Sequence, residues 1–68
     1  MTFVYKSATV NNYVIELYQN KFDTVYRVAV YPVVSDNLLG YAVSDLSYTT
    51  EKQAINRFNS AKRYYSKI

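Results

Sequence analysis

The stretch NNYVIELYQNKFDTVYRVAVYP, from Asn11 to Pro32, decides the fold of this chain. Apolar and polar residues alternate on both sides of a short connection, which is typical of two half-buried β-strands. The Asn11-Asn12 pair that opens the stretch suits a two-residue hairpin, because asparagine tolerates the positive φ that such turns require. The stretch therefore predicts three successive antiparallel strands, with a hairpin on each side of the middle one.

The two connections also predict how the strands are paired. The first is the Asn11-Asn12 turn and the second is a loop at residues 20–23. The expected opposed pairs are Val10–Tyr13, Ala8–Ile15 and Tyr5–Tyr18 in the first hairpin, and Gln19–Thr24, Leu17–Tyr26, Ile15–Val28, Tyr13–Val30 and Glu16–Arg27 in the second. A one-residue slip would exchange the two faces, so the hydrophobic pattern selects this register. The Glu16–Arg27 pair would join opposite charges across the strands.

One face of these strands is a core, and the other is unexpectedly apolar. The core face holds Val4, Ala8, Val10, Tyr13, Ile15, Leu17, Tyr26, Val28 and Val30. Lys6 falls on this face, where a position near the sheet edge would let its amine reach water. The other face places Tyr5, Val14, Tyr18, Val25, Ala29 and Tyr31 around Glu16 and Arg27. A solvated face would be more polar, so this surface needs an explanation.

The next segment completes the sheet. Pro32 cannot donate to a strand ladder, so it either ends the third strand or sits at a bulge. Residues 35–40 are expected to form a loop, and residues 41–48 a fourth strand. Either Ala42, Ser44, Leu46 and Tyr48 face inward, or Tyr41 and Val43 do; the first arrangement is favoured because Asp45 then faces outward.

A helix is expected from Glu51 to Ile68. Thr50 and Gln53 have the spacing of a capping box, and neither Gly nor Pro interrupts the segment. One stripe at helical spacing is apolar: Ala54, Ile55, Phe58, Ala61, Tyr65 and Ile68. The predicted fold is therefore α+β, a four-stranded antiparallel sheet in the order β-β-β-β-α, with one C-terminal amphipathic helix packed on one face, as a single domain over residues 1–68.

Composition narrows the function. The 68 residues include no Cys and no His, and the five acidic residues are not closely paired within one element. The sequence thus predicts no metal site, no cofactor and no catalytic residues, and hence no enzyme. We see neither a signal peptide nor a membrane span, so we expect a cytoplasmic protein without a membrane partner.

Two surfaces are candidates for binding. The first is the apolar sheet face, with a partner-binding set of Tyr5, Val14, Glu16, Tyr18, Arg27 and Tyr31. Tyr and Arg are enriched at binding hot spots, and the face is expected to bind a host protein or ribonucleoprotein complex, or a second copy of the chain. The alternative is single-stranded nucleic acid, stacked on sheet tyrosines and held by a basic helix with Lys52, Arg57, Lys62, Arg63 and Lys67.

The opening FVYKSATVNNYVIELYQN resembles a type I-F anti-CRISPR protein, a small phage protein that blocks the RNA-guided surveillance complex of bacteria. The resemblance covers the first two strands and the start of the helix, and the family's extra C-terminal helical segment is missing here. The shared positions are Phe3, Tyr5, Ser7, Asn12, Tyr13, Tyr18, Asn20, Thr50 and Glu51.

The resemblance implies inhibition by occlusion. Members of that family place sheet-face tyrosines and an acidic residue against the crRNA-bound backbone subunits, which prevents target DNA from pairing. Only Tyr5 and Tyr18 carry over by position. The family's acidic contact has no clear counterpart in this chain, and Glu16 is chosen for that role from its neighbours alone. The expected function is thus a non-enzymatic, phage-encoded inhibitor in the bacterial cytoplasm. A nucleic-acid-binding protein and a homodimeric structural module remain the alternatives.

Overall fold

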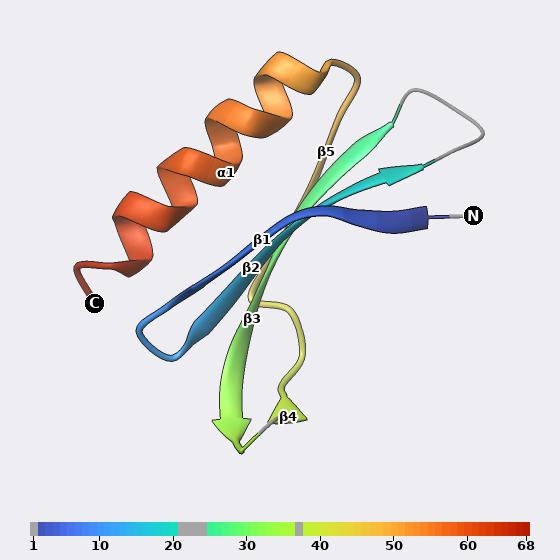
Figure 1. Cartoon of the computed structure of the whole chain (residues 1–68). Helices are drawn as coiled ribbons and strands as arrows, with labels where there is room; N and C mark the ends of the chain where they lie inside the picture. The colour runs from blue at the N-terminus through green and yellow to red at the C-terminus, as the bar shows by residue number, and fades with distance from the viewer. Residues whose placement is uncertain (1, 21–24, 37) are drawn as a thin grey trace.

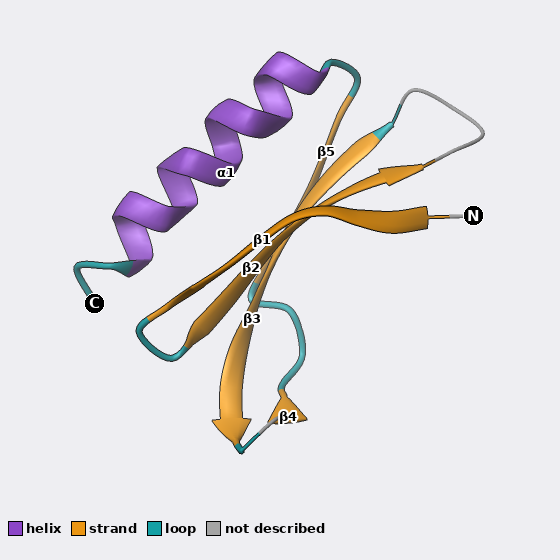
Figure 2. Ribbon diagram, viewed as in Figure 1, coloured by secondary structure: helices purple, strands orange, loops and turns teal. Residues whose placement is uncertain are grey.

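The computed structural model describes residues 2–20, 25–36 and 38–68, and it confirms an antiparallel sheet with one helix on one face (Figure 1, Figure 2). The elements are β1 (Thr2–Val10), β2 (Tyr13–Asn20), β3 (Tyr26–Ser35), β4 (Leu38–Leu39), β5 (Ser44–Tyr48) and α1 (Glu51–Tyr65). β2 lies between β1 and β3, while β4 and β5 each pair with β3. The predicted α+β class and element order are confirmed, with a two-residue strand added.

The first hairpin forms around Asn11, whose φ of 53° is the left-handed conformation that asparagine tolerates. The predicted pairs Val10–Tyr13 and Ala8–Ile15 are confirmed. The predicted Tyr5–Tyr18 pair is wrong, because the register shifts between Val4 and Lys6 and Val4 is opposite Tyr18. Such a β-bulge sets two residues of one strand against one of its partner.

The second hairpin keeps the predicted faces but not the predicted partners. Gln19 pairs with Tyr26 instead of Thr24. Thr24 and residues 21–23 of the predicted loop at 20–23 lie outside the described residues. Every pair of this hairpin is consequently displaced by two residues: Leu17 is opposite Val28, Ile15 opposite Val30, Tyr13 opposite Pro32 and Glu16 opposite Ala29. A shift of two preserves the side-chain alternation, so each residue stays on its face. The predicted Glu16–Arg27 pair is wrong.

Pro32 lies inside β3, so of the two expected alternatives the strand end is wrong, and a bulge in the neighbouring segment lies opposite Pro32. The strand continues to Ser35, since Val33 donates its N–H to the Asn12 carbonyl at 2.7 Å and the Pro32 carbonyl accepts from Gly40 at 2.8 Å. The predicted loop at residues 35–40 contains β4, and the predicted strand at 41–48 begins only at Ser44. The regular strand pairing is therefore interrupted in the segment opposite Pro32, between β4 and β5.

The core lies between the sheet and α1. Four sheet side chains are fully buried and meet three from the helix: Ile15, Leu17, Val28, Val30, Ala54, Phe58 and Ala61. Phe58 is 4% exposed in the same cluster as Ile15 and Val28, as the helical stripe predicts. On β5, Tyr48 packs against this core and the Ser44 hydroxyl accepts from the Arg57 guanidinium of α1 at 3.2 Å, as the favoured facing predicts. The other two residues of that predicted inward set, Ala42 and Leu46, are exposed, so the prediction is wrong for them.

Both ends of α1 have defined partners. At the start, the Thr50 hydroxyl accepts from the Gln53 backbone N–H at 3.3 Å, as the capping spacing predicts. The helix ends at Tyr65, so its predicted continuation to Ile68 is wrong. The Asn11 side-chain amide donates to the carbonyls of Tyr65 and Ile68, at 2.8 and 3.2 Å. The turn of the first hairpin thereby holds the C-terminal end of the helix.

Candidate interaction surface

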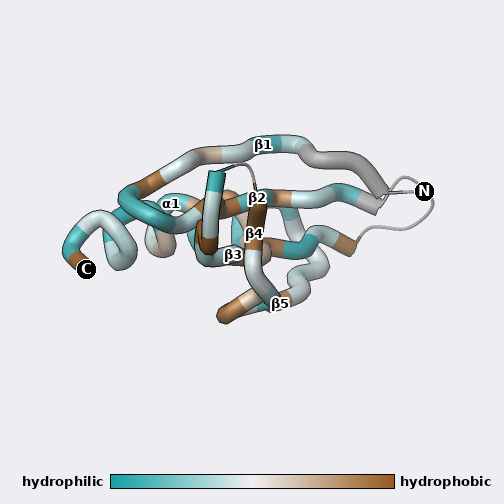
Figure 3. Tube along the Cα trace, turned by 90° about the horizontal axis from the view of Figure 1, so that it is seen from below, coloured by the Kyte–Doolittle hydropathy of each residue, from teal (hydrophilic) through white to brown (hydrophobic). Residues whose placement is uncertain are grey.

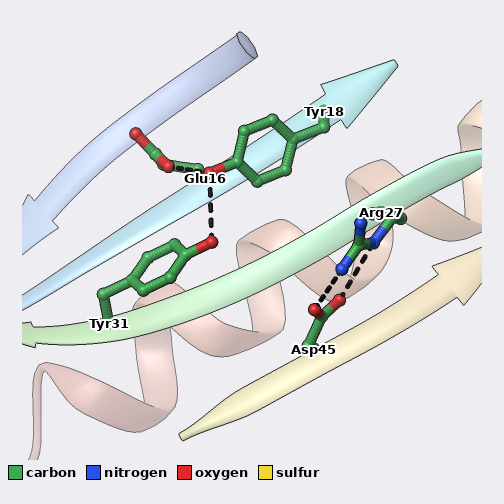
Figure 4. Close-up of polar contacts among 5 residues, drawn as sticks. All are labelled: Glu16, Tyr18, Arg27, Tyr31 and Asp45. Carbon is green, nitrogen blue, oxygen red and sulfur yellow. Dashed lines mark hydrogen bonds and ion pairs between the residues drawn. The ribbon is translucent and has the colours of Figure 1, made fainter. Parts of the chain in front are cut away.

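The face of the sheet opposite α1 carries five of the six predicted partner-binding residues. Val14, Glu16 and Tyr18 alternate along β2, and Arg27 and Tyr31 lie on β3. Figure 4 views the polar members of this set from the side of the sheet that faces away from the helix. Among the described residues, no helix covers this surface, which we call the open face.

Tyr18, Glu16 and Tyr31 form one hydrogen-bonded group on the open face. The Tyr18 hydroxyl donates to Glu16 Oε1, and the hydroxyls of Tyr18 and Tyr31 lie 3.2 Å apart (Figure 4). Burial, followed by the hydrogen bonds to Glu16 and Tyr31, raises the pKa of the Tyr18 phenol. Both rings are half-buried and tied at their tips, so this group has a fixed orientation before any partner arrives.

Arg27 is paired with Asp45 of β5 instead of Glu16. Its Nε donates to Asp45 Oδ1 at 3.2 Å, and its Nη2 contacts Oδ2 as an ion pair (Figure 4). The two-pronged contact with Asp45 raises the pKa of Arg27. The alternation in β5 indicates that Asp45 faces outward, but it does not predict which residue of β3 lies opposite, so this partner was missed.

Ala29 explains much of why the open face is apolar. It pairs with Glu16 on one side and Asp45 on the other, in the middle strand of the sheet. Its methyl group is shorter than the surrounding side chains, and it is only 1% exposed. The small residue therefore fills a shallow second packing layer, enclosed by Tyr18, Tyr31 and the Arg27–Asp45 pair.

Tyr5 is the predicted partner-binding residue that the structure places elsewhere. Its hydroxyl donates to Glu51 Oε2 at 2.6 Å, at the start of α1, and this bond raises the pKa of the Tyr5 phenol. The bulge between Val4 and Lys6 accounts for the change of side. The position of Lys6 on the core face was the sign in the sequence that this strand is irregular. Inward-facing charged residues and β-bulges are both features of edge strands.

The basic residues of α1 do not act as one group. Lys52, Lys62, Arg63 and Lys67 are exposed, whereas Arg57 is half-buried and donates to Ser44. Lys62 also lies close to Phe58, with its Nζ 5.7 Å from the ring centroid, and Lys6 approaches the same ring at 5.9 Å. Part of the predicted basic surface is thus engaged in packing and cation–π contacts.

The described residues offer little to hold a small molecule. Across residues 2–20, 25–36 and 38–68 there is no pocket and no cluster of three or more His, Cys, Asp or Glu side chains that could hold a metal. No helix in this part of the chain has the length and apolar character needed to cross a membrane. No family model, curated protein or solved structure matches the chain. Its function must accordingly be argued from its surfaces.

Proposed function

We propose that this chain is a non-enzymatic binding protein whose open face docks on a protein or ribonucleoprotein surface. The observation that carries the proposal is the fixed pair of Tyr18 and Tyr31, half-buried on a face without a covering element among the described residues. Tyrosine supplies large contact area with few rotatable bonds. Because Glu16 already bonds Tyr18, docking has less side-chain entropy left to remove.

The distribution of charge favours a protein surface over single-stranded nucleic acid. A base-stacking module needs aromatic rings and cations along one track. Here Tyr18 and Tyr31 lie on the open face, where Arg27 is engaged by Asp45. Lys52 and Arg63 lie on the helix on the opposite side, and Lys67 follows its C-terminal end. The two halves of a nucleic-acid site are therefore separated by the sheet.

The resemblance to type I-F anti-CRISPR proteins supplies the class of partner. It makes the partner the crRNA-loaded surveillance complex, the action occlusion of target DNA, and the site of action the bacterial cytoplasm. Of the two tyrosines that carry over by position, Tyr18 lies on the open face and sits beside an acidic residue, Glu16. Tyr5 bonds to the helix instead, and we leave it out of the proposed surface.

Inhibition of DNA binding tests this proposal. A crRNA-loaded type I-F surveillance complex is mixed with labelled target duplex, and bound DNA is measured as the protein is added. We expect the wild-type chain to block binding. The Tyr18→Ala/Tyr31→Ala variant should need roughly 30-fold more protein, which corresponds to a hot-spot loss of about 2 kcal/mol.

A charge-reversal variant on the helix is the matched control. Lys52, Arg63 and Lys67 are exposed, so their replacement by Glu should leave both folding and inhibition intact. Thermal unfolding of each variant reports whether it is folded. If the wild-type chain leaves DNA binding unchanged, the partner class is wrong. If the helix variant loses inhibition while the tyrosine variant keeps it, the open face is not the site.

A further inference from the structure

A second surface, distinct from the open face, follows the outer edge of the sheet. Nine large hydrophobic residues among those described are exposed, and five of them fall within the short segment from β4 to β5. We call these five the edge patch: Leu38, Leu39, Tyr41, Val43 and Leu46. Figure 3 shows hydrophobic stretches at β4 and in the segment that leads to β5.

A bulge between β4 and β5 displays the centre of the edge patch. Leu39 pairs with Val33 and Ser44 with Val30, so residues 40–43 lie opposite residues 31–32. Gly40 and Val43 hold the ends of the bulge by donating to the carbonyls of Pro32 and Val30, each at 2.8 Å. The extra length turns Tyr41 out of the sheet, where it is 97% exposed.

The bulge is fixed on one side by close packing. A Cβ atom at Gly40 would lie 3.0 Å from Pro32 Cγ and 3.1 Å from Val34 Cγ1, so any larger residue there would push these side chains aside by a few tenths of an ångström. Bulges of this kind redirect a side chain and recur at functional positions. Tyr41 is thus an exposed tyrosine that a defined backbone feature holds away from the sheet.

The charges of the segment fit a contact with an identical surface. A two-fold contact brings the same patch of both copies together, so an uncompensated charge would meet its own copy. The segment from Leu38 to Tyr48 contains one charged residue, Asp45, and Arg27 neutralises it. By contrast, the helix would bring Lys62, Arg63 and Lys67 against like charges.

The size of the edge patch is also appropriate. A fully exposed tyrosine offers roughly 200 Å² of surface, and four half-exposed aliphatic side chains bring the patch into the range of several hundred Å² that marks docking sites. The outer backbone edge of β5, which pairs with no strand among the described residues, adds to this. A stable dimer needs about 800 Å² on each partner.

The small core gives self-association a physical role. Domains below roughly 70–80 residues usually need a disulfide, a metal or an oligomer in addition to their core. This chain has no Cys and no His, and its core consists of seven buried hydrophobic residues among those described. Of these three, self-association is the one left to stabilise the fold. A dimer formed through the edge patch would leave the open face available to another partner.

We infer that a second copy of this chain covers the edge patch, in a two-fold dimer formed along β4 and β5. Sedimentation equilibrium over a concentration series tests the inference. The wild-type chain should pass from monomer to dimer as concentration rises. Tyr41→Lys places like charges across the two-fold contact and should raise the dissociation constant at least tenfold.

Thr9→Lys is the control, because it adds the same charge at an exposed position of β1, the strand at the opposite edge of the sheet. It should leave the dissociation constant unchanged. Tyr41→Ser serves as a second variant without a new charge, and circular dichroism checks that each variant is folded. A wild-type chain that stays monomeric up to about 1 mM, in the weak range of affinities, overturns the inference. The inference is also overturned if the dimer persists in both Tyr41 variants, or if Thr9→Lys weakens the dimer as much as Tyr41→Lys does.

Discussion

On the helix side of β3, Val28 and Val30 are fully buried against Phe58 by apolar contacts. On the other side of the same strand, Ala29 is equally buried, but its neighbours Glu16 and Asp45 are each held by a hydrogen-bonded partner. Side chains of one strand thus enter two different environments. Burial alone therefore does not distinguish a structural face from a binding face. The two faces differ in the polarity of the side chains around the buried residue.

The helix side should carry most of the stability. Phe58→Ala should lower the free energy of unfolding by about 3–5 kcal/mol, since the substitution leaves a cavity among Ile15, Val28 and Ala61. Chemical denaturation measures the loss, which exceeds what many small domains hold in total. Phe58→Leu keeps most of the volume and should cost less than about 1.5 kcal/mol. Equal effects of the two substitutions would show that the ring does not fill the core.

The open side should contribute less, and with a particular pH dependence. Tyr18→Phe removes the bond to Glu16 and should cost about 1 kcal/mol at neutral pH. The pKa of the Tyr18 phenol is raised above its ordinary 10.0 in the folded chain. Above pH 10 the unfolded chain therefore releases this proton while the folded chain retains it, so stability falls as pH rises.

Denaturation of the wild-type chain and Tyr18→Phe above pH 10 checks this sign. The variant should lose stability less steeply with pH, because its position 18 has no proton to release. A residual slope is expected from Tyr5, whose pKa is also raised, by its bond to Glu51. Identical slopes for the two proteins would mean that Tyr18 does not keep its proton in the folded state.

The Arg27–Asp45 pair should have the smallest effect on folding. The two side chains are 50% and 35% exposed, and exposed ion pairs contribute about 0.2–1 kcal/mol. Arg27→Gln should therefore remain folded, with a small decrease in the unfolding free energy that shrinks further at high salt. Asp45→Asn and the double variant complete a cycle that isolates the pair. A loss above about 2 kcal/mol would place this pair in the structural core instead.

Sequence alternation predicted which face each residue occupies better than it predicted which residues meet. The period of two survives any shift by an even number of residues, so Ile15 and Tyr18 took their predicted faces although the second hairpin is displaced by two. The displacement depends on the conformation of the connection, for which the pattern of the strands gives no information. The prediction of Arg27 opposite Glu16 failed for this reason, and Asp45 was missed with it.

The other departures arise where the backbone leaves regular geometry. A bulge near Tyr5 moved that side chain to the helix side. A second bulge, at residues 40–43, delays the strand predicted from residue 41 until Ser44. Bulges break the alternation on which the prediction depends. At the end of α1 the Tyr65 carbonyl accepts from Asn11, which is far away in sequence, so the helical pattern alone could not reveal this contact.

Three buried alanines allow the most direct test of the claim that the open face binds the partner. Ala29 lies on the open face, whereas Ala54 and Ala61 lie in the helix-side core, and all three are at most 1% exposed. Alanine methyl NMR of labelled protein, with and without the crRNA-loaded surveillance complex, reports both environments at once. We predict a changed Ala29 signal in the complex, with the Ala54 and Ala61 signals keeping their positions. An unchanged Ala29 signal alongside shifted Ala54 and Ala61 signals would contradict the account.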